Sequence, residues 1–231
     1  MTDRVAIVTG GTGALGQAIT TTLLGAGGVV AIPYAVEEEL AALQSRLAPD
    51  QRARLLAMAA DVTDEAAVGK FVQAVRDRHG RVDGLVNAVG GFAGGDLLST
   101  TLAEWERMMA LNLTSAVIAC RATLPVMIAG GGGRVVNIAS RAVLAPSGGF
   151  IAYTVSKAGV ITLTQALAQE VRKHRITVNA VLPSTMDTPG NRRAMPDADR
   201  SGWVRTEDVA HAVAFLLSEQ AGAITGASVT V

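Results

Sequence analysis

The stretch Val5-Ala6-Ile7-Val8-Thr9-Gly10-Gly11-Thr12-Gly13-Ala14-Leu15-Gly16 joins a short apolar run to a glycine-rich turn, and a helical pattern follows over residues 17–24. Glycines in such a turn let the backbone approach a pyrophosphate closely, and free N–H groups at the start of a helix bind its negative charge. A P-loop would need lysine after the last glycine, where this chain has Gln17. The order of strand, turn and helix predicts a dinucleotide site, and a tight turn without a ligand is the alternative.

Short apolar runs rich in β-branched residues recur along the rest of the chain, with helical patterns between them. They lie at residues 29–32, 55–58, 84–86, 134–138, 176–181 and 224–229. Because strands alternate with helices and are almost wholly apolar, the pattern predicts an α/β protein. The expected fold is a single Rossmann-like, doubly wound parallel sheet of about seven strands with helices on both faces. Residues 1–231 are expected to form one domain, in which the long irregular stretch 183–203 is a functional loop.

Charge balance and cysteine content exclude several kinds of function. The chain has 20 Lys and Arg against 20 Asp and Glu, so no basic excess favours nucleic acid or an anionic membrane surface. One cysteine, Cys120, permits neither an internal disulfide nor a cysteine-based zinc site, and the histidines lack partners at ligand spacing. The longest uncharged stretch, 5–36, is broken by glycines and threonines, which argues against a membrane span. We therefore expect a cytoplasmic protein that binds no metal, nucleic acid or membrane.

A second constellation lies in the other half of the chain. Tyr153 and Lys157 are four residues apart in a helical pattern, so their side chains share one face. Ser140 follows the apolar run 134–138, at the edge where open α/β sheets bind ligands. A hydroxyl donor beside a cation suits chemistry in which negative charge grows on an oxygen. Asn112 is a fourth candidate, with helix capping as its alternative, and Tyr153 alone could equally be a core residue.

At this point the chain resembles the short-chain dehydrogenase/reductase family, in the branch with a Tyr-x-x-x-Lys active site. The resemblance covers essentially the whole length. The family's glycine motif falls on Thr9, Gly10, Ala14 and Gly16, with Ala14 in place of its middle glycine. Its other cofactor motifs fall on Asp61-Val62, Asn87-Ala88-Val89-Gly90 and Pro183-Ser184-Thr185-Met186-Asp187-Thr188.

The resemblance implies a catalytic domain that transfers a hydride between NAD(P)(H) and a carbonyl or alcohol substrate. It implies a tetrad of Asn112, Ser140, Tyr153 and Lys157, in which Tyr153 is the general acid and base, Lys157 also binds the nicotinamide ribose, and Asn112 positions a water. The cofactor contacts are expected at Thr9, Gly10, Thr12, Gly13, Ala14, Leu15, Gly16, Tyr34, Asp61, Val62, Asn87, Ala88, Gly90, Tyr153, Lys157, Pro183, Thr185, Met186 and Thr188. The substrate contacts are expected at Phe92, Arg141, Val143, Phe150, Met186, Arg192 and Trp203, the last three in the substrate loop 183–203.

Two further expectations concern the cofactor and the acid. The position where an acid would bind the ribose of NAD is Tyr34, and no Arg or Lys stands at Thr12, Gly13 or Ala35 to bind the extra phosphate of NADP. NAD or NADP is therefore expected, with a slight preference for NAD. At roughly 6 Å and an effective dielectric near 20, Lys157 is expected to lower the pKa of Tyr153 by about two units.

Two alternative functions stay open. Residues 89–95 and 182–199 are similar to dihydropteridine reductases, which keeps a quinonoid dihydropteridine-type reductase in view. A dinucleotide-sensing protein without turnover is the other alternative. The expected partners are a small carbonyl substrate and copies of the same chain, since the family resemblance implies a homotetramer packed through helices at about 102–129 and 152–174 and through the last strand.

Overall fold

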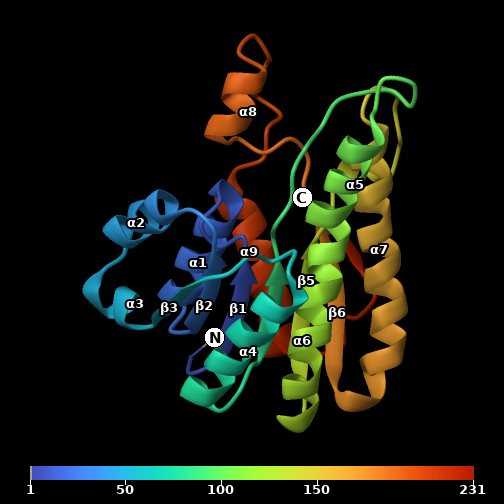
Figure 1. Cartoon of the computed structure of the whole chain (residues 1–231). Helices are drawn as coiled ribbons and strands as arrows, with labels where there is room; N and C mark the ends of the chain where they lie inside the picture. The colour runs from blue at the N-terminus through green and yellow to red at the C-terminus, as the bar shows by residue number, and fades with distance from the viewer. Residues whose placement is uncertain (1) are drawn as a thin grey trace.

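The computed structural model describes residues 2–231 and contains a parallel sheet of seven strands (Figure 1). The strands are β1 (Val5–Thr9), β2 (Val29–Tyr34), β3 (Leu55–Ala59), β4 (Gly84–Asn87), β5 (Gly133–Ile138), β6 (Ile176–Leu182) and β7 (Ser228–Thr230). Their order in the sheet is β3-β2-β1-β4-β5-β6-β7, so the winding direction reverses between β1 and β4. Open α/β sheets bind ligands at such a reversal, beyond the carboxyl ends of the strands.

Helices cover both faces of the sheet, as the sequence predicts. On one face α1 (Ala14–Gly25), α2 (Glu37–Arg46) and α9 (Thr206–Leu217) pack into an apolar core. On the other, α4 (Glu65–His79), α6 (Ser115–Ala129) and α7 (Ile151–Val171) form a second core around Phe71. The central strands are buried on both sides, which explains why they are continuous apolar runs rather than alternating ones.

The chain has three shorter α-helices, and one of them, α5, continues into α6. These are α3 (Pro49–Ala53), α5 (Leu102–Met109) and α8 (Pro189–Ala194). A π-helical turn, Ala110–Thr114, joins α5 to α6, so residues 102–129 run as one helix. By length and composition alone this helix could cross a membrane, with a mean hydropathy of 1.5. Its inner face packs into the second core, which accounts for its apolar side chains.

Two predicted boundaries are wrong. The last strand covers 228–230 and not 224–229, because the chain is still turning before it. The Ile224 N–H donates to the Ala221 carbonyl at 2.9 Å, and Gly226 has φ +74°, a left-handed conformation. The stretch 183–203 is not wholly irregular, since it contains α8. Thr188 caps that helix by accepting a bond from the Asn191 N–H at 3.1 Å.

Candidate active site

The four predicted catalytic residues come together at the carboxyl edge of the sheet. Ser140 lies just beyond the end of β5, Tyr153 and Lys157 lie one turn apart on α7, and Asn112 lies on the π turn. These elements are far apart in the sequence. Lys157 donates to the end of β5, and Asn112 both accepts from and donates to Gly91 in the loop after β4. The sheet edge is therefore the meeting point that the predicted tetrad requires.

Lys157 is held inside the protein with its ammonium group fixed. It is only 5 % exposed, and its Nζ donates to the carbonyl of Ile138, the last residue of β5, at 2.8 Å. Burial disfavours the charged form and lowers the pKa of Lys157 to about 8. No carboxylate pairs with Lys157 among residues 2–231, so its charge is available to a ligand at this edge.

Tyr153 differs from the expectation in its acidity. Burial raises the pKa of Tyr153 above its usual value of 10.0, and a hydrogen bond with Ser140 opposes this rise. The predicted lowering of the Tyr153 pKa by Lys157 is therefore wrong for the protein without cofactor, because the dominant influence is burial and the opposing one comes from Ser140. At neutral pH Tyr153 is a protonated donor, which suits the transfer of a proton to a substrate oxygen.

Asn112 connects the loop after β4 to α7. It is 2 % exposed, its Oδ1 accepts from the Gly91 N–H at 2.8 Å, and its Nδ2 donates to the Ser156 Oγ at 2.9 Å. Ser156 in turn donates to the Tyr153 carbonyl at 2.8 Å. The amide of Asn112 thus bonds across the site rather than to a helix end, and π turns of this kind occur often at functional sites. Its role in positioning a water stays a prediction, and Ser156 is a supporting residue that sequence analysis missed.

The side chains of Asn112 and Lys157 both lie close to the backbone at Gly90. A Cβ at Gly90 would lie 2.8 Å from Asn112 Oδ1 and 3.1 Å from Lys157 Nζ. Asn112 and Lys157 therefore approach the same backbone position from two different helices. No side chain larger than glycine fits there without moving one of them.

Aromatic rings form one wall beside Tyr153. The Phe92 ring lies edge-on to Tyr153 with centroids 5.0 Å apart, and Phe150 lies 6.4 Å from Tyr153 and 5.9 Å from Phe92. Phe92 is 64 % exposed, so an apolar surface next to the hydroxyl faces solvent. Arg141 and Val143 lie on the short helical turn that follows Ser140. Phe92 and Phe150 thus lie beside Tyr153, and their contact with a substrate stays a prediction.

The three predicted substrate residues of the loop have partners of their own. Arg192 forms a two-pronged ion pair with Asp187, with Nη2 2.7 Å from Oδ2. The Arg200 guanidinium lies 5.6 Å from the Trp203 ring centre. Met186, in the same loop, pairs with Val204. Contact between Arg192 or Trp203 and a substrate stays a prediction.

The glycine-rich turn is shaped to receive a pyrophosphate. A Cβ at Gly16 would lie 1.8 Å from the Gly10 carbonyl oxygen, and Gly10 has φ +70° with Ala88 3.0 Å from where its own Cβ would be. Helix α1 starts here with neither a side-chain cap nor an acidic residue in its first turn. The first N–H groups of a helix have no partner within it, so this end attracts an anion. The predicted residues Thr9 to Gly16 fit a dinucleotide at this turn.

The expected adenosine end is built from the ends of β2 and β3. Asp61 lies just beyond β3, and bonds from Thr63 lower the pKa of its carboxyl, so it is ionised at neutral pH. Tyr34 ends β2, and its hydrogen bond to Glu37 raises the pKa of its hydroxyl. Val62 packs against the second core instead of standing free.

Glu39 is an acid that sequence analysis missed at this end. It lies on α2, and its Oε2 accepts from the Thr12 hydroxyl at 2.9 Å. Both residues line a cavity of about 440 Å³ between the glycine turn, α2 and the start of α9. The run of three glutamates at the start of α2 was the available signal, but only the packing of α2 shows which one reaches the turn.

The side chain of Asn87, a predicted cofactor contact, forms a buried hydrogen bond within the sheet. Its Nδ2 donates to Asn137 Oδ1 at 2.8 Å, and Asn137 donates to Thr164 at 2.9 Å. These buried amides join β4, β5 and α7 beneath the site. The Asn87 side chain therefore supports the sheet edge through its Nδ2, while its Oδ1 has no partner among residues 2–231, and contact between Asn87 and a cofactor stays a prediction. Pro183, Thr185 and Thr188 follow β6 at the same edge.

Comparisons with known proteins show the family and the fold of the chain. A family profile described as short chain dehydrogenase matches residues 4–199. The chain is 34 % identical to 2-(R)-hydroxypropyl-CoM dehydrogenase of Xanthobacter autotrophicus over 242 residues, covering 98 % of this chain and 96 % of that protein. It is 31 % identical to levodione reductase of Leifsonia aquatica over 251 residues, covering 100 % and 93 %. A solved short-chain type dehydrogenase/reductase from Mycobacterium ulcerans superimposes with a TM-score of 0.93 at 28 % identity, covering 100 % of this chain and 89 % of that one.

Proposed function

The chain belongs to the short-chain dehydrogenase family, whose relatives are oxidoreductases, and on that premise we propose that it interconverts a carbonyl compound and the corresponding alcohol with NAD(P)(H). The observation that carries this proposal is the convergence of Tyr153, Ser140 and Lys157 at the edge of the sheet beside a glycine turn that fits a pyrophosphate. A protein that only senses a dinucleotide has no need for a buried acid at this place.

The cofactor-holding residues follow from the shape of the edge. The free N–H groups of Ala14 and Leu15 at the start of α1 would hold the pyrophosphate, and Lys157 would hold the nicotinamide ribose. When bound, NAD(P)(H) supplies the hydride chemistry. The residues of the protein bind and orient the cofactor and supply the proton for the substrate oxygen.

Tyr153 and Ser140 act on the substrate oxygen. In the direction of reduction, negative charge grows on that oxygen, and the protonated Tyr153 hydroxyl donates to it while Ser140 gives a second hydrogen bond. The Lys157 ammonium adds a positive field at the same place, and Asn112 holds the loop after β4 in register with α7. In the reverse direction Tyr153 must first lose its proton, which its raised pKa opposes.

A preference for NAD follows from Glu39. Its carboxylate sits beside Thr12 at the glycine turn, where it accepts from a ribose hydroxyl and repels the additional phosphate of NADP. Phe92 and Phe150 favour a substrate with an apolar or ring-shaped body next to its carbonyl group.

The test is a substrate panel assayed with NADH and NADPH separately, followed by the absorbance of the reduced nicotinamide. The panel contains cyclic and aliphatic ketones, β-ketoacyl thioesters and quinonoid dihydropterin. We expect turnover of at least one ketone, faster with NADH. Turnover of dihydropterin alone would favour the pteridine reductase alternative, and cofactor binding without turnover of any member would favour a sensor.

We also propose a cytoplasmic homo-oligomer, with a tetramer as the expected form. Apolar side chains on the outer side of the long helices support this, since Leu102 is 79 % exposed and Ile128 and Val155 are also exposed. Sedimentation at micromolar concentration tests it, and a stable monomer would refute it. The single cysteine, Cys120, is buried with its thiol pKa raised to about 12, which suits a reducing compartment.

A further inference from the structure

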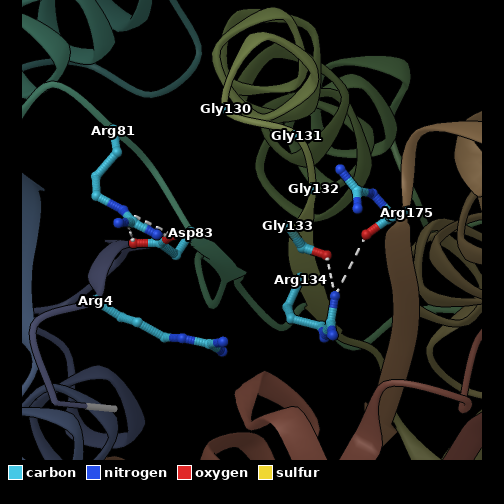
Figure 2. A pocket seen from close by; sticks show the side chains of 9 residues that line it. All are labelled: Arg4, Arg81, Asp83, Gly130, Gly131, Gly132, Gly133, Arg134 and Arg175. Atoms are coloured by element: carbon cyan, nitrogen blue, oxygen red, sulfur yellow. Dashed lines mark hydrogen bonds and ion pairs between the residues drawn. The ribbon is translucent and has the colours of Figure 1, made fainter.

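A cavity of about 280 Å³ lies at the amino edge of the sheet, on the opposite side from Tyr153 (Figure 2). Its walls come from the residues that precede or begin β1, β4, β5 and β6. This space is enough for a small ligand and too little for a whole dinucleotide. Four arginines line it, namely Arg4, Arg81, Arg134 and Arg175.

Two of these arginines are neutralised by carboxylates. Arg81 forms a forked pair with Asp83, with Nη2 2.6 Å from Oδ1, and the other oxygen of Asp83 accepts from the Val5 N–H at 2.8 Å. Arg4 pairs with Glu219 at 2.6 Å. The carboxylate of Asp83, which lines the cavity, and that of Glu219, which lies outside the lining, are thus already engaged.

The other two arginines carry uncompensated charge. Arg134 donates through Nη1 to the Gly133 carbonyl at 2.9 Å, whereas its buried Nε has no partner among residues 2–231. Burial and the nearby Arg4 lower the pKa of Arg134, as expected where positive charge is in excess. Within the same described range the Arg175 guanidinium makes no hydrogen bond or ion pair, although its backbone carbonyl accepts from Arg134. Four guanidinium groups therefore face two carboxylates in a chain whose net charge is zero.

The backbone is shaped to leave this corner open. Gly131 has φ +82°, and a Cβ there would lie 3.2 Å from Arg175 Nη2, so the glycine makes room for the guanidinium. Arg175 itself has φ +59°, a left-handed conformation that glycine adopts more readily than arginine. Arg175 ends the helical turn Arg172–His174 in this conformation, and its exposed guanidinium lines the cavity.

We infer that this cavity is a second binding site, which takes the phosphate group of a small phosphorylated molecule between Arg134 and Arg175 on one wall and Arg4 and Arg81 on the other. The planar guanidinium fork matches two phosphate oxygens at once, and the exposed Arg175 guanidinium, unpaired among residues 2–231, offers such a fork to the cavity. Figure 2 shows the Arg134 and Arg175 side chains on one side of the cavity and those of Arg4 and Arg81 across from them. The site shares no residue with the catalytic edge, so it does not depend on the proposed reaction.

The test compares Arg175→Gly with the wild type, using inorganic phosphate and pyrophosphate as probes. Thermal unfolding is measured without cofactor, against sodium chloride of the same ionic strength. For the wild type we expect Tm to rise by about 3–6 °C when the anion is at roughly ten times its dissociation constant. Arg175→Gly removes one charged donor and should weaken binding at least about tenfold. Without anion it should unfold no earlier than the wild type, because glycine accepts the left-handed backbone.

A matched control separates this site from any phosphate bound at the turn of α1. Arg172→Gln removes an exposed charge three residues away and leaves the cavity intact, so it should respond like the wild type. Arg134→Gln should lose the response as Arg175→Gly does. The inference is overturned if Arg175→Gly keeps its affinity within twofold, or if neither probe raises Tm beyond the chloride control.

Discussion

The buried lysine of the site should destabilise the fold, so replacing it with a neutral side chain of similar length should stabilise the protein near neutral pH. Lys157 is almost wholly buried, and burial lowers its pKa from 10.5 to about 8. Below pH 8 the folded protein must hold a buried charge that the unfolded chain exposes to water. Lys157→Met removes this cost together with one hydrogen bond to the Ile138 carbonyl.

The magnitude follows from the difference between the two pKa values. For a shift from 10.5 to about 8, burial of the charge costs about 3 kcal/mol at pH 7, at 1.36 kcal/mol per unit. Loss of the bond to Ile138 costs about 1–2 kcal/mol. The net expectation is a gain of about 1–2 kcal/mol in the free energy of unfolding at pH 7.

The sign should reverse at alkaline pH. A depressed lysine pKa contributes stability that is fully present above 10.5 and is lost as pH falls through about 8. At pH 10.5 the burial cost is therefore largely gone from the wild type, and the variant is left about 1 kcal/mol less stable through its lost hydrogen bond. The extra stability of Lys157→Met over the wild type thus shrinks as pH rises, and at pH 10.5 the variant is the less stable protein.

Urea unfolding of wild type and variant at pH 7, 9 and 10.5, at one protein concentration and without cofactor, measures this directly. Lys70→Met, which changes an exposed lysine on α4, is the control and should show no such pH dependence. A Lys157→Met variant that is destabilised equally at all three pH values would refute the reasoning, because it would show that the buried charge carries no cost.

Three further predictions concern the catalytic edge and the cofactor. Oxidation of the alcohol should speed up as pH rises above neutrality, because the raised pKa of Tyr153 keeps the base form scarce; a pH-independent oxidation rate in initial-rate profiles would contradict this. Gly90→Ala should lower kcat at least about tenfold with an unchanged circular dichroism spectrum, since its Cβ displaces Asn112 or Lys157, and full activity would refute the close approach. Glu39→Ala should reduce the ratio of kcat/KM for NADH over NADPH about tenfold, or about 1.4 kcal/mol, and an unchanged ratio would exclude Glu39 from the ribose site.

Most of the fold was predictable because strands that are buried on both faces are continuous apolar runs in the sequence. The six strands from β1 to β6 lie on the apolar runs that predict them. The last one does not, because Ile224 has the composition of a strand residue but is held in a turn by Ala221 and Gly226. Short-range composition cannot distinguish these two states.

The site was predictable where it depends on residues close together in the sequence. Tyr153 and Lys157 share a helix face by spacing alone, and the glycine turn follows directly from β1. The partners of Asn112 were not predictable, because the π turn and the pairing with Gly91 and Ser156 depend on packing between distant segments.

The direction of the Tyr153 pKa shift also could not be predicted from the sequence. The sequence shows that a cation follows Tyr153, but it does not show how deeply the tyrosine is buried or that Ser140 bonds to it. These two factors decide the direction of its pKa shift. Glu39 is a similar case, since its contact with Thr12 depends on where α2 packs.

The central claim is that the Tyr153 hydroxyl is the proton donor, and Tyr153→Phe tests it most directly. The substitution deletes one oxygen and keeps the ring that packs against Phe92 and Phe150. On a substrate turned over by the wild type, kcat should fall by about 10² to 10⁴, as expected for loss of a general acid. NAD(P)H should still bind, because Lys157 and the glycine turn are intact. A variant that keeps more than a tenth of the wild-type kcat would contradict the account, since another group would then have to donate the proton.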